Sequence, residues 1–283
     1  MVKLFNFWYF FFILLCAGFI VGLYFLLRKK SRKTKIIVLG SILFFNLLLH
    51  FLKLTFPPYS TNPDKAMRDV WFINVCATSV LFFPFIFLSK SDTAKDYMVS
   101  LGVISGFLAM FYPTEALDKS VLTLDLWRFY ICHIIIIAVP LLTVLLDLHK
   151  LDVKRIWKTP ICVMAMLLFV ICNQVLQSEL GIIPLRDDDI FNINFTNTSL
   201  IWGPTDDVAV LFSWLTPNFM KVIPYGQFAG QEKYWPFFWM TPAIVLYFLL
   251  IPLILCFILN GKETVKTFKN LFSKVKISSL KKR

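Results

Sequence analysis

The sequence predicts an all-α polytopic membrane protein, and its composition and its charge distribution both point to that class. Long apolar runs recur along the 283 residues, of which 58% are hydrophobic and only 16% are charged. The mean hydropathy is +0.72, and 31 residues are phenylalanine. A soluble domain of this length carries more charge. A closed β-barrel would instead show short strands of alternating polarity, a pattern that this sequence lacks.

Seven apolar segments are long enough, or nearly long enough, to cross a bilayer, which takes about 20 helical residues. They are residues 4–27, 36–52, 70–88, 99–113, 127–147, 161–178 and 237–259. The second and fourth are short, which makes their ends harder to place. The first is followed by RKKSRKTK and has no small-residue cleavage pattern, so we expect a membrane span and not a cleaved signal peptide.

The number of lysine and arginine residues alternates between high and low from one connection to the next. One set of connections holds 20 of the 29 lysine and arginine residues, and it comprises residues 28–35, 89–98, 148–160 and 260–283. The positive-inside rule then predicts an external N-terminus and a cytoplasmic C-terminus. We therefore expect a seven-helix transmembrane domain over residues 1–260 and a basic cytoplasmic tail over 261–283. The tail suits either an amphipathic helix on an anionic leaflet or a disordered topology anchor.

The longest connection, residues 179–236 between the sixth and seventh helices, is predicted to be external. Its apolar stretch 208–215 is too short to span, which is typical of a re-entrant or interfacial segment. We interpret the acidic clusters in this loop as solvated charge in preference to a cation site. They are Asp187–Asp189 and Asp206–Asp207. Asn194 and Asn197 lie in N-x-S/T sequons, which matter only in a host that glycosylates its outer face.

Several functional classes are disfavoured by the sequence. The net charge of +12 lies beside apolar runs and forms no basic stripe interleaved with aromatic residues, so nucleic acid is not an expected partner. The six cysteines, at positions 16, 76, 132, 162, 172 and 256, lie within apolar runs without a CxxC pair. We therefore expect no disulfide framework, metal site or cofactor. The sequence has no pair of matching helices broken by glycine or proline, which counts against a secondary transporter. Gly102 and Gly106 form a G-x-x-x-G step that predicts close helix packing.

Polar and reactive side chains gather in the outer halves of the predicted spans. Cys76 and His133 each lie six residues in from the outer end of their span, or roughly 9 Å deep at about 1.5 Å per residue. His50 lies near the outer end of the second span, and Asn173 lies in the outer part of the sixth. Asn74 is about half a turn from Cys76. These residues are predicted to surround a cavity on the outer-leaflet side.

A thiol beside an imidazole is a recognised nucleophile. The histidine takes the thiol proton, and the thiolate attacks an ester to form an acyl-thioester. Asparagine side chains nearby are suited to orient the imidazole or to stabilise an oxyanion. A cysteine in a membrane helix also serves as a small packing residue, so the pattern by itself leaves catalysis and packing as alternatives.

Four stretches resemble one known family when taken in order. They are NLLLHFL, which contains His50, WFINVCATS around Cys76, SLGVISGFLAMFYP, and RFYICHIIIIAVPL around His133. The chain resembles the bacterial YwaF-type integral membrane proteins, which are related to the TMEM164 acyltransferases and more distantly to androgen-induced-gene-type lipid hydrolases. The resemblance covers roughly residues 40–260. It implies Cys76 as nucleophile, His133 as base, membrane lipids as acyl donor and acceptor, and a bacterial plasma membrane location.

We therefore expect a lipid acyltransferase or lipid hydrolase with a Cys76–His133 pair and with Asn74, His50 and Asn173 in support. The alternative is a non-catalytic protein that binds lipids or a partner, or a small transporter, with its long external loop as the working surface. The sequence does not indicate an oligomeric state.

Overall fold

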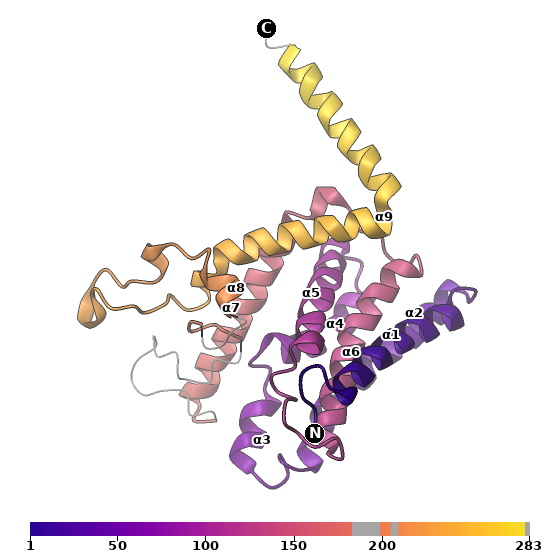
Figure 1. The fold of residues 1–283 in the computed structure, drawn as a ribbon. Coiled ribbons are helices and arrows are strands. Elements are labelled where there is room, and N and C mark those ends of the chain that lie inside the picture. Colours follow the sequence, from indigo (N-terminus) through magenta and orange to yellow (C-terminus); the bar gives the residue numbers. More distant parts are fainter. Residues whose placement is uncertain (183–198, 205–208, 281–283) are drawn as a thin grey trace.

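The computed structural model describes residues 1–182, 199–204 and 209–280, and it is all-α (Figure 1). Six helices are long and apolar enough to cross a membrane, and α4 is a shorter apolar helix. These seven are α1 (Phe7–Leu27), α2 (Arg32–Leu52), α4 (Val75–Leu88), α5 (Asp92–Phe111), α6 (Leu124–Leu145), α7 (Lys158–Glu179) and α9 (Thr241–Leu280). Two short helices lie in the connections, α3 (Pro63–Val70) and α8 (Val210–Ser213).

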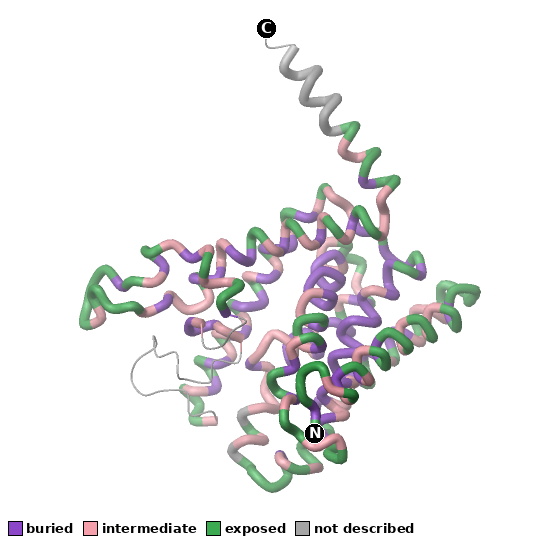
Figure 2. Tube along the Cα trace, in the orientation of Figure 1, coloured by how far each residue is buried: buried purple, intermediate pink, exposed green. Residues whose placement is uncertain are grey.

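Helix α6 is the centre of the bundle. Of its most apolar 18-residue stretch 78% is buried, and it contacts α1, α2, α4 and α5 (Figure 2). The closest of these partners is α5, through the two glycines of the G-x-x-x-G step. A Cβ atom at Gly102 would lie 2.6 Å from the Ile136 carbonyl oxygen, and one at Gly106 would overlap Cγ1 of Ile137. The predicted packing role of these glycines is confirmed.

Two helices begin several residues before the apolar runs from which they were predicted. The run 36–52 lies in α2, which begins at Arg32, and the run 99–113 overlaps α5, which begins at Asp92. In both helices a serine caps the polar first turn. Ser31 accepts a hydrogen bond from the Thr34 N–H, and Ser91 accepts one from the Ala94 N–H. The caps therefore extend the helices beyond the residues that periodicity and hydropathy identify.

The third span, predicted over residues 70–88, was wrong at its N-terminal end. Helix α4 begins only at Val75, because Asn74 has an extended backbone and its side chain caps the helix. The side-chain oxygen of Asn74 accepts a hydrogen bond of 2.7 Å from the Ala77 N–H. The preceding residues, 71–74, are not helical. Cys76 therefore lies in the first turn of a helix and not six residues inside one.

The seventh span, predicted over residues 237–259, is the first part of α9. The backbone of Asn260 departs from helical geometry, with φ −134° and ψ 38°, and the helix changes direction there (Figure 1). The side-chain amide of Asn260 donates a hydrogen bond of 3.2 Å to the Leu151 carbonyl in the α6–α7 connection. Beyond the bend, α9 continues helically through the predicted tail to Leu280.

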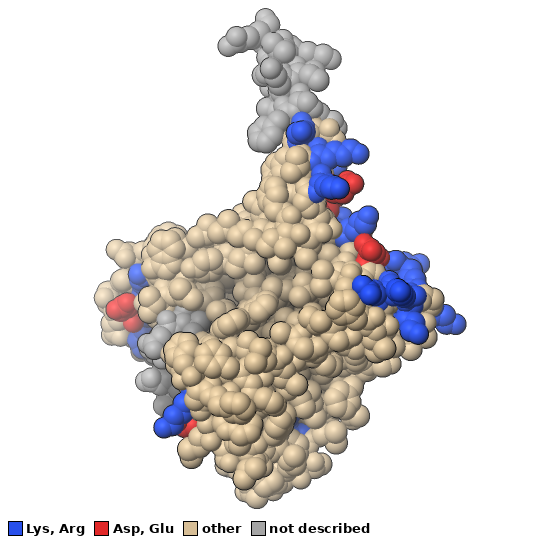
Figure 3. All heavy atoms as spheres, turned by 45° about the vertical axis from the view of Figure 1, so that its right-hand side comes forward, with Lys and Arg blue, Asp and Glu red and all other residues tan. Residues whose placement is uncertain are grey.

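The connections with most lysine and arginine residues contact one another. Arg32 and Lys35 donate hydrogen bonds to carbonyls of residues 146–148, and Arg155 pairs with Asp96 of α5 at 2.6 Å. Lysine and arginine gather in Figure 3 near the α1–α2 turn and along the C-terminal part of α9. The bundle therefore has a strongly basic end.

Only part of the predicted external loop lies within the described residues. The apolar stretch predicted over 208–215 contains α8, where Val210 and Leu211 are exposed. The acidic clusters and the sequon asparagines fall outside the described residues, and they are Asp187–Asp189, Asp206–Asp207, Asn194 and Asn197. Trp239 anchors the described part of the loop, because its indole N–H donates to the Leu200 carbonyl at 2.8 Å.

Candidate functional site

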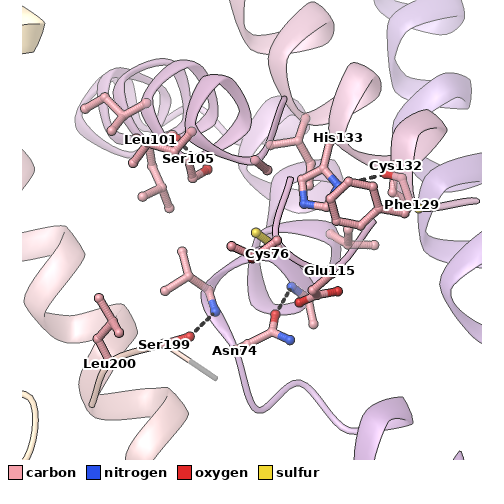
Figure 4. Close-up of a pocket in the computed structure, with 18 of the residues that line it drawn as sticks. Asn74, Cys76, Leu101, Ser105, Glu115, Phe129, Cys132, His133, Ser199 and Leu200 are labelled. Carbon is pink, nitrogen blue, oxygen red and sulfur yellow. Dashed lines mark hydrogen bonds between the residues drawn. The ribbon is translucent and has the colours of Figure 1, made fainter. Parts of the chain in front are cut away.

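A cavity of about 780 Å³ lies between the helices, and its charged lining residues belong to the end of the bundle away from the basic turns. Figure 4 shows part of its lining. Residues of α2, α4, α5, α6, α7 and α9 line it, together with residues of the connections before α4 and before α6. Its size is typical of a site for a small molecule. Of the residues singled out from the sequence, Cys76, His133, His50 and Asn74 line this one cavity.

Cys76 belongs to the first turn of α4, where backbone N–H groups have no partner within the helix. Two of these donors are satisfied nearby. The Val75 N–H donates to Ser199 Oγ at 2.9 Å, and the Ala77 N–H donates to Asn74. Among the described residues, the Cys76 N–H has no hydrogen-bond acceptor. The positive end of the helix dipole and a free backbone donor thus lie beside the thiol.

His133 is buried on the face of α6 that lines the cavity. Its Nδ1 lies 2.7 Å from the Phe129 carbonyl oxygen. A carbonyl only accepts, so Nδ1 carries the proton, and Nε2 of the neutral ring has a free lone pair. Figure 4 shows the ring with its Nε2 edge on the side of Cys76. Within the described part of the chain, no hydrogen bond joins the two side chains, and an unbound nucleophile and base are often loosely placed.

The segment before α4 is held by side chains from α2 and α7. His50 Nε2 donates to the Val70 carbonyl at 2.8 Å. Asn173 Nδ2 donates to the Phe72 carbonyl at 3.2 Å, and Gln174 Nε2 donates to the Ile73 carbonyl at 2.8 Å. These bonds satisfy carbonyl groups of a non-helical backbone segment, as irregular structure requires wherever water is scarce.

Of the two supporting residues on α2 and α7, His50 lines the cavity as predicted, whereas Asn173 does not. Asn173 does not line the cavity, although its amide holds the Phe72 carbonyl. His50 lines the cavity, but its Nε2 already serves Val70 and its ring stacks on Phe72 at 5.0 Å. Through these hydrogen bonds both residues fix the backbone that positions the N-terminus of α4.

Sequence analysis missed the charged residues at the mouth of the cavity. Glu115, in the connection before α6, lies among Asn74, Cys76 and His133, close enough to influence the thiol and the imidazole electrostatically (Figure 4). Lys53 and Arg128 lie at the same rim. Lys53 and Arg128 are ionisable residues at the outer ends of predicted spans. Ionisable residues in such positions are the usual sequence signal of an intramembrane site.

The rest of the cavity is apolar. Its walls come from four helices and the α8 region, and they include Leu101, Ile104, Ile136, Met166, Leu167, Phe212, Ile244 and Phe248. A thiol and an imidazole thus lie where a charged mouth changes to a hydrocarbon-like interior. Such a boundary suits an amphipathic molecule whose ester group lies between its polar head and its acyl chain.

These features define a polytopic helical membrane protein with an amphipathic cavity that opens beside a Cys–His pair. The chain belongs to the TMEM164 family, whose model matches residues 3–251. The match includes every residue that lines the cavity. No curated protein and no solved structure matched the chain.

Proposed function

We propose that the protein is a membrane acyltransferase or lipid hydrolase in which Cys76 carries the acyl group as a thioester. The observation that carries the proposal is the position of Cys76 and His133 in one cavity, between a charged mouth and an apolar interior. Membership of the TMEM164 family supports it further. The acyl donor and acceptor are membrane lipids.

In the first half-reaction His133 acts as the general base. Its Nε2 takes the proton from Cys76 Sγ, and the thiolate attacks the carbonyl carbon of a lipid ester. The C–O bond to the glycerol oxygen then breaks, and that oxygen takes the proton from the imidazolium. The products are a lysolipid and an acyl-thioester on Cys76. The bond between Nδ1 and the Phe129 carbonyl keeps the required tautomer throughout.

The negative charge on the ester oxygen in the tetrahedral intermediate needs hydrogen-bond donors. The Cys76 N–H and Asn74 Nδ2 both suit this role, because neither donates a hydrogen bond to another described residue. A single donor of this kind accelerates acyl transfer by about 10²- to 10³-fold.

The second half-reaction regenerates the thiol. A lipid hydroxyl, or water in the hydrolase case, gives its proton to His133 Nε2 and attacks the thioester carbon. The C–S bond then breaks, and the thiolate takes the proton back. The largely apolar walls favour a lipid hydroxyl over water as the acceptor.

We further propose the finer points of topology and origin that the sequence indicates. Seven helices cross the membrane, with the N-terminus outside and the C-terminus in the cytoplasm, which places the charged mouth in the outer leaflet. The four motif stretches support a YwaF-type protein of a bacterial plasma membrane.

The test of the function is acyl labelling of the purified protein. After incubation with a phospholipid that carries a labelled acyl chain, we expect label on the chain that hydroxylamine removes. Cys76→Ala should abolish the label, and His133→Gln should slow its appearance by about 10²- to 10⁴-fold.

Cys132→Ala is the matched control, because Cys132 lines the same cavity but lies on α6, away from any helix N-terminus. It should label as the wild type does. Label that persists at the wild-type level in Cys76→Ala would show that Cys76 is not the nucleophile. If the wild type is not acylated either, the thioester mechanism is contradicted.

A further inference from the structure

Four basic side chains line the mouth of the cavity, and they are Lys53, Lys65, Lys119 and Arg128. Lys53 is the unusual one, because it is only 4% exposed. Lysine is almost never this buried unless an anion pairs with it. The Lys53 ammonium donates to the backbone carbonyl of Asp69, and no carboxylate pairs with it among the described residues.

The mouth is organised around the ring of Tyr59. Lys53, Lys65 and Arg128 lie 5.3, 5.4 and 5.6 Å from its centroid. Arg128 Nη2 donates to the Tyr59 hydroxyl at 3.2 Å, so the hydroxyl proton is free for another acceptor. Burial raises the pKa of Tyr59 above its ordinary value, which keeps this proton in place. Three cations around one ring repel each other strongly unless anions lie among them.

The carboxylates nearby satisfy some of these cations and not others. Asp69 pairs with Lys65 at 2.9 Å. Asp125 pairs with both Lys119, at 2.9 Å, and Arg128, at 2.8 Å. Arg128 directs Nε and Nη2 at Asp125, and its guanidinium also lies beside the Cys132 thiol. Glu115 is the remaining carboxylate that lines the cavity, and it forms no ion pair with another described residue. Four basic side chains thus face three carboxylates, and unbalanced positive charge beside the buried Lys53 is unfavourable unless a further anion binds.

We propose that Lys53 and Arg128, with the Tyr59 hydroxyl, bind the phosphate of a membrane phospholipid at the mouth of the cavity. The proposal rests on the proposed function only in taking this cavity as the lipid site. A phosphate diester keeps its negative charge at any physiological pH, and a compact ammonium beside a guanidinium is a common way to bind it. The apolar walls beyond the mouth then receive the acyl chains of the same molecule.

This arrangement also selects among lipids. A diacylglycerol has the same chains and esters but no phosphate, so it leaves Lys53 buried without an anion. The site should therefore prefer a phospholipid over a neutral lipid with identical acyl chains.

The test measures binding in the Cys76→Ala background, where no acyl transfer can occur. The ligands are a short-chain phosphatidylcholine with a fluorescent acyl chain and the diacylglycerol with the same two chains. We expect the phosphatidylcholine to bind more tightly. Lys53→Met should weaken its binding by about 10- to 100-fold and leave diacylglycerol binding unchanged. Lys53→Arg keeps the charge and should retain most of the affinity.

Lys119→Met is the control for general attraction by the basic rim, because Lys119 lines the same mouth with its side chain 43% exposed. It should change phosphatidylcholine binding by less than about 3-fold. The proposal would be overturned if the Cys76→Ala protein bound phosphatidylcholine and diacylglycerol equally. It would also be overturned if the preference for phosphatidylcholine survived the added Lys53→Met change. Displacement of the lipid by millimolar inorganic phosphate would overturn it too, because it would indicate a site for the free ion. Unchanged diacylglycerol binding shows that the variant is folded. The result is independent of whether Cys76 forms a thioester.

Discussion

At the scale of single residues, Asn74 joins the fold to the chemistry. Its side-chain oxygen ends the extended segment and starts α4 by accepting the Ala77 N–H. Asn74 also lines the same cavity as Cys76. In the proposed mechanism the oxygen of this amide sets the start of the helix, and its nitrogen donates to the developing oxyanion. A substitution that keeps the capping oxygen but removes the donating nitrogen therefore distinguishes the two roles.

Asn74→Asp keeps a good cap and removes the nitrogen donor, so the variant should fold as the wild type does. Its acylation rate should fall by about 10²- to 10³-fold, because a carboxylate cannot donate to an oxyanion and repels it. Asn74→Ala should lose the cap as well, with a destabilisation of about 1 kcal/mol. The rate of label incorporation and the unfolding temperature by circular dichroism measure the two effects. An Asn74→Asp protein that acylates at the wild-type rate would contradict the donor role.

Cys76 and His133 could be singled out from the sequence, but the charged residues around them could not. Cys76 and His133 were predicted to share a depth, and the structure brings both to one cavity. The reasoning used cysteine, histidine and amide side chains, because these stand out within apolar runs. Lys53 and Arg128 lie at the ends of such runs, where basic residues are usually interpreted as topology signals. Glu115 lies in a connection, and only the fold shows that this connection returns over Cys76.

At the scale of elements, the start of α4 shows what hydropathy alone does not predict. Residues 70–74 are apolar enough to belong to a membrane helix, yet 71–74 are not helical. Their carbonyls bond to side chains of His50, Asn173 and Gln174, which lie 20 or more residues away in sequence. A local pattern cannot contain that information, because these polar partners come from α2 and α7.

The α5–α6 contact was predictable from spacing, and it gives a stability test. Gly106→Ala would place a methyl group against Ile137, and overpacking of this kind destabilises by about 1–3 kcal/mol. We expect the unfolding temperature to fall by about 2–10 °C. The double variant Gly106→Ala/Ile137→Ala should recover part of this loss, because the second change removes the overlapping atoms.

Gly22→Ala in α1 is the matched control, since a Cβ atom there meets no atom within 4 Å. Alanine favours a helix by up to about 1 kcal/mol relative to glycine, so this variant should be as stable as the wild type or more so. If Gly106→Ala unfolds at the same temperature as Gly22→Ala, the helices do not require close approach at this glycine.

At the scale of the whole molecule, the connections divide into two groups that meet at different ends. The N-terminus contacts the connection before α6, since the Val2 N–H donates to the Lys119 carbonyl at 3.1 Å. Tyr9 Oη donates to the Phe111 carbonyl at 3.0 Å at that same end. At the basic end, Arg155 joins α5 through Asp96, which also accepts a hydrogen bond of 2.7 Å from His149. Charge counting assigns these two groups of connections to opposite sides of the membrane, and it depends on composition and not on packing.

The orientation of these ends in the membrane is the last prediction, and single cysteines on the two ends test it. Thr61→Cys lies on the connection near the cavity mouth, and Lys29→Cys lies on the basic α1–α2 turn, both at exposed positions. With the N-terminus outside, a membrane-impermeant maleimide should label Thr61→Cys in intact cells. Lys29→Cys should react only after permeabilisation. The wild type measures the background from the six native thiols, which all lie on apolar helices. Labelling of Lys29→Cys in intact cells would reverse the topology and place the charged mouth at the cytoplasmic leaflet, where the lipids available to Cys76 would be those of that leaflet.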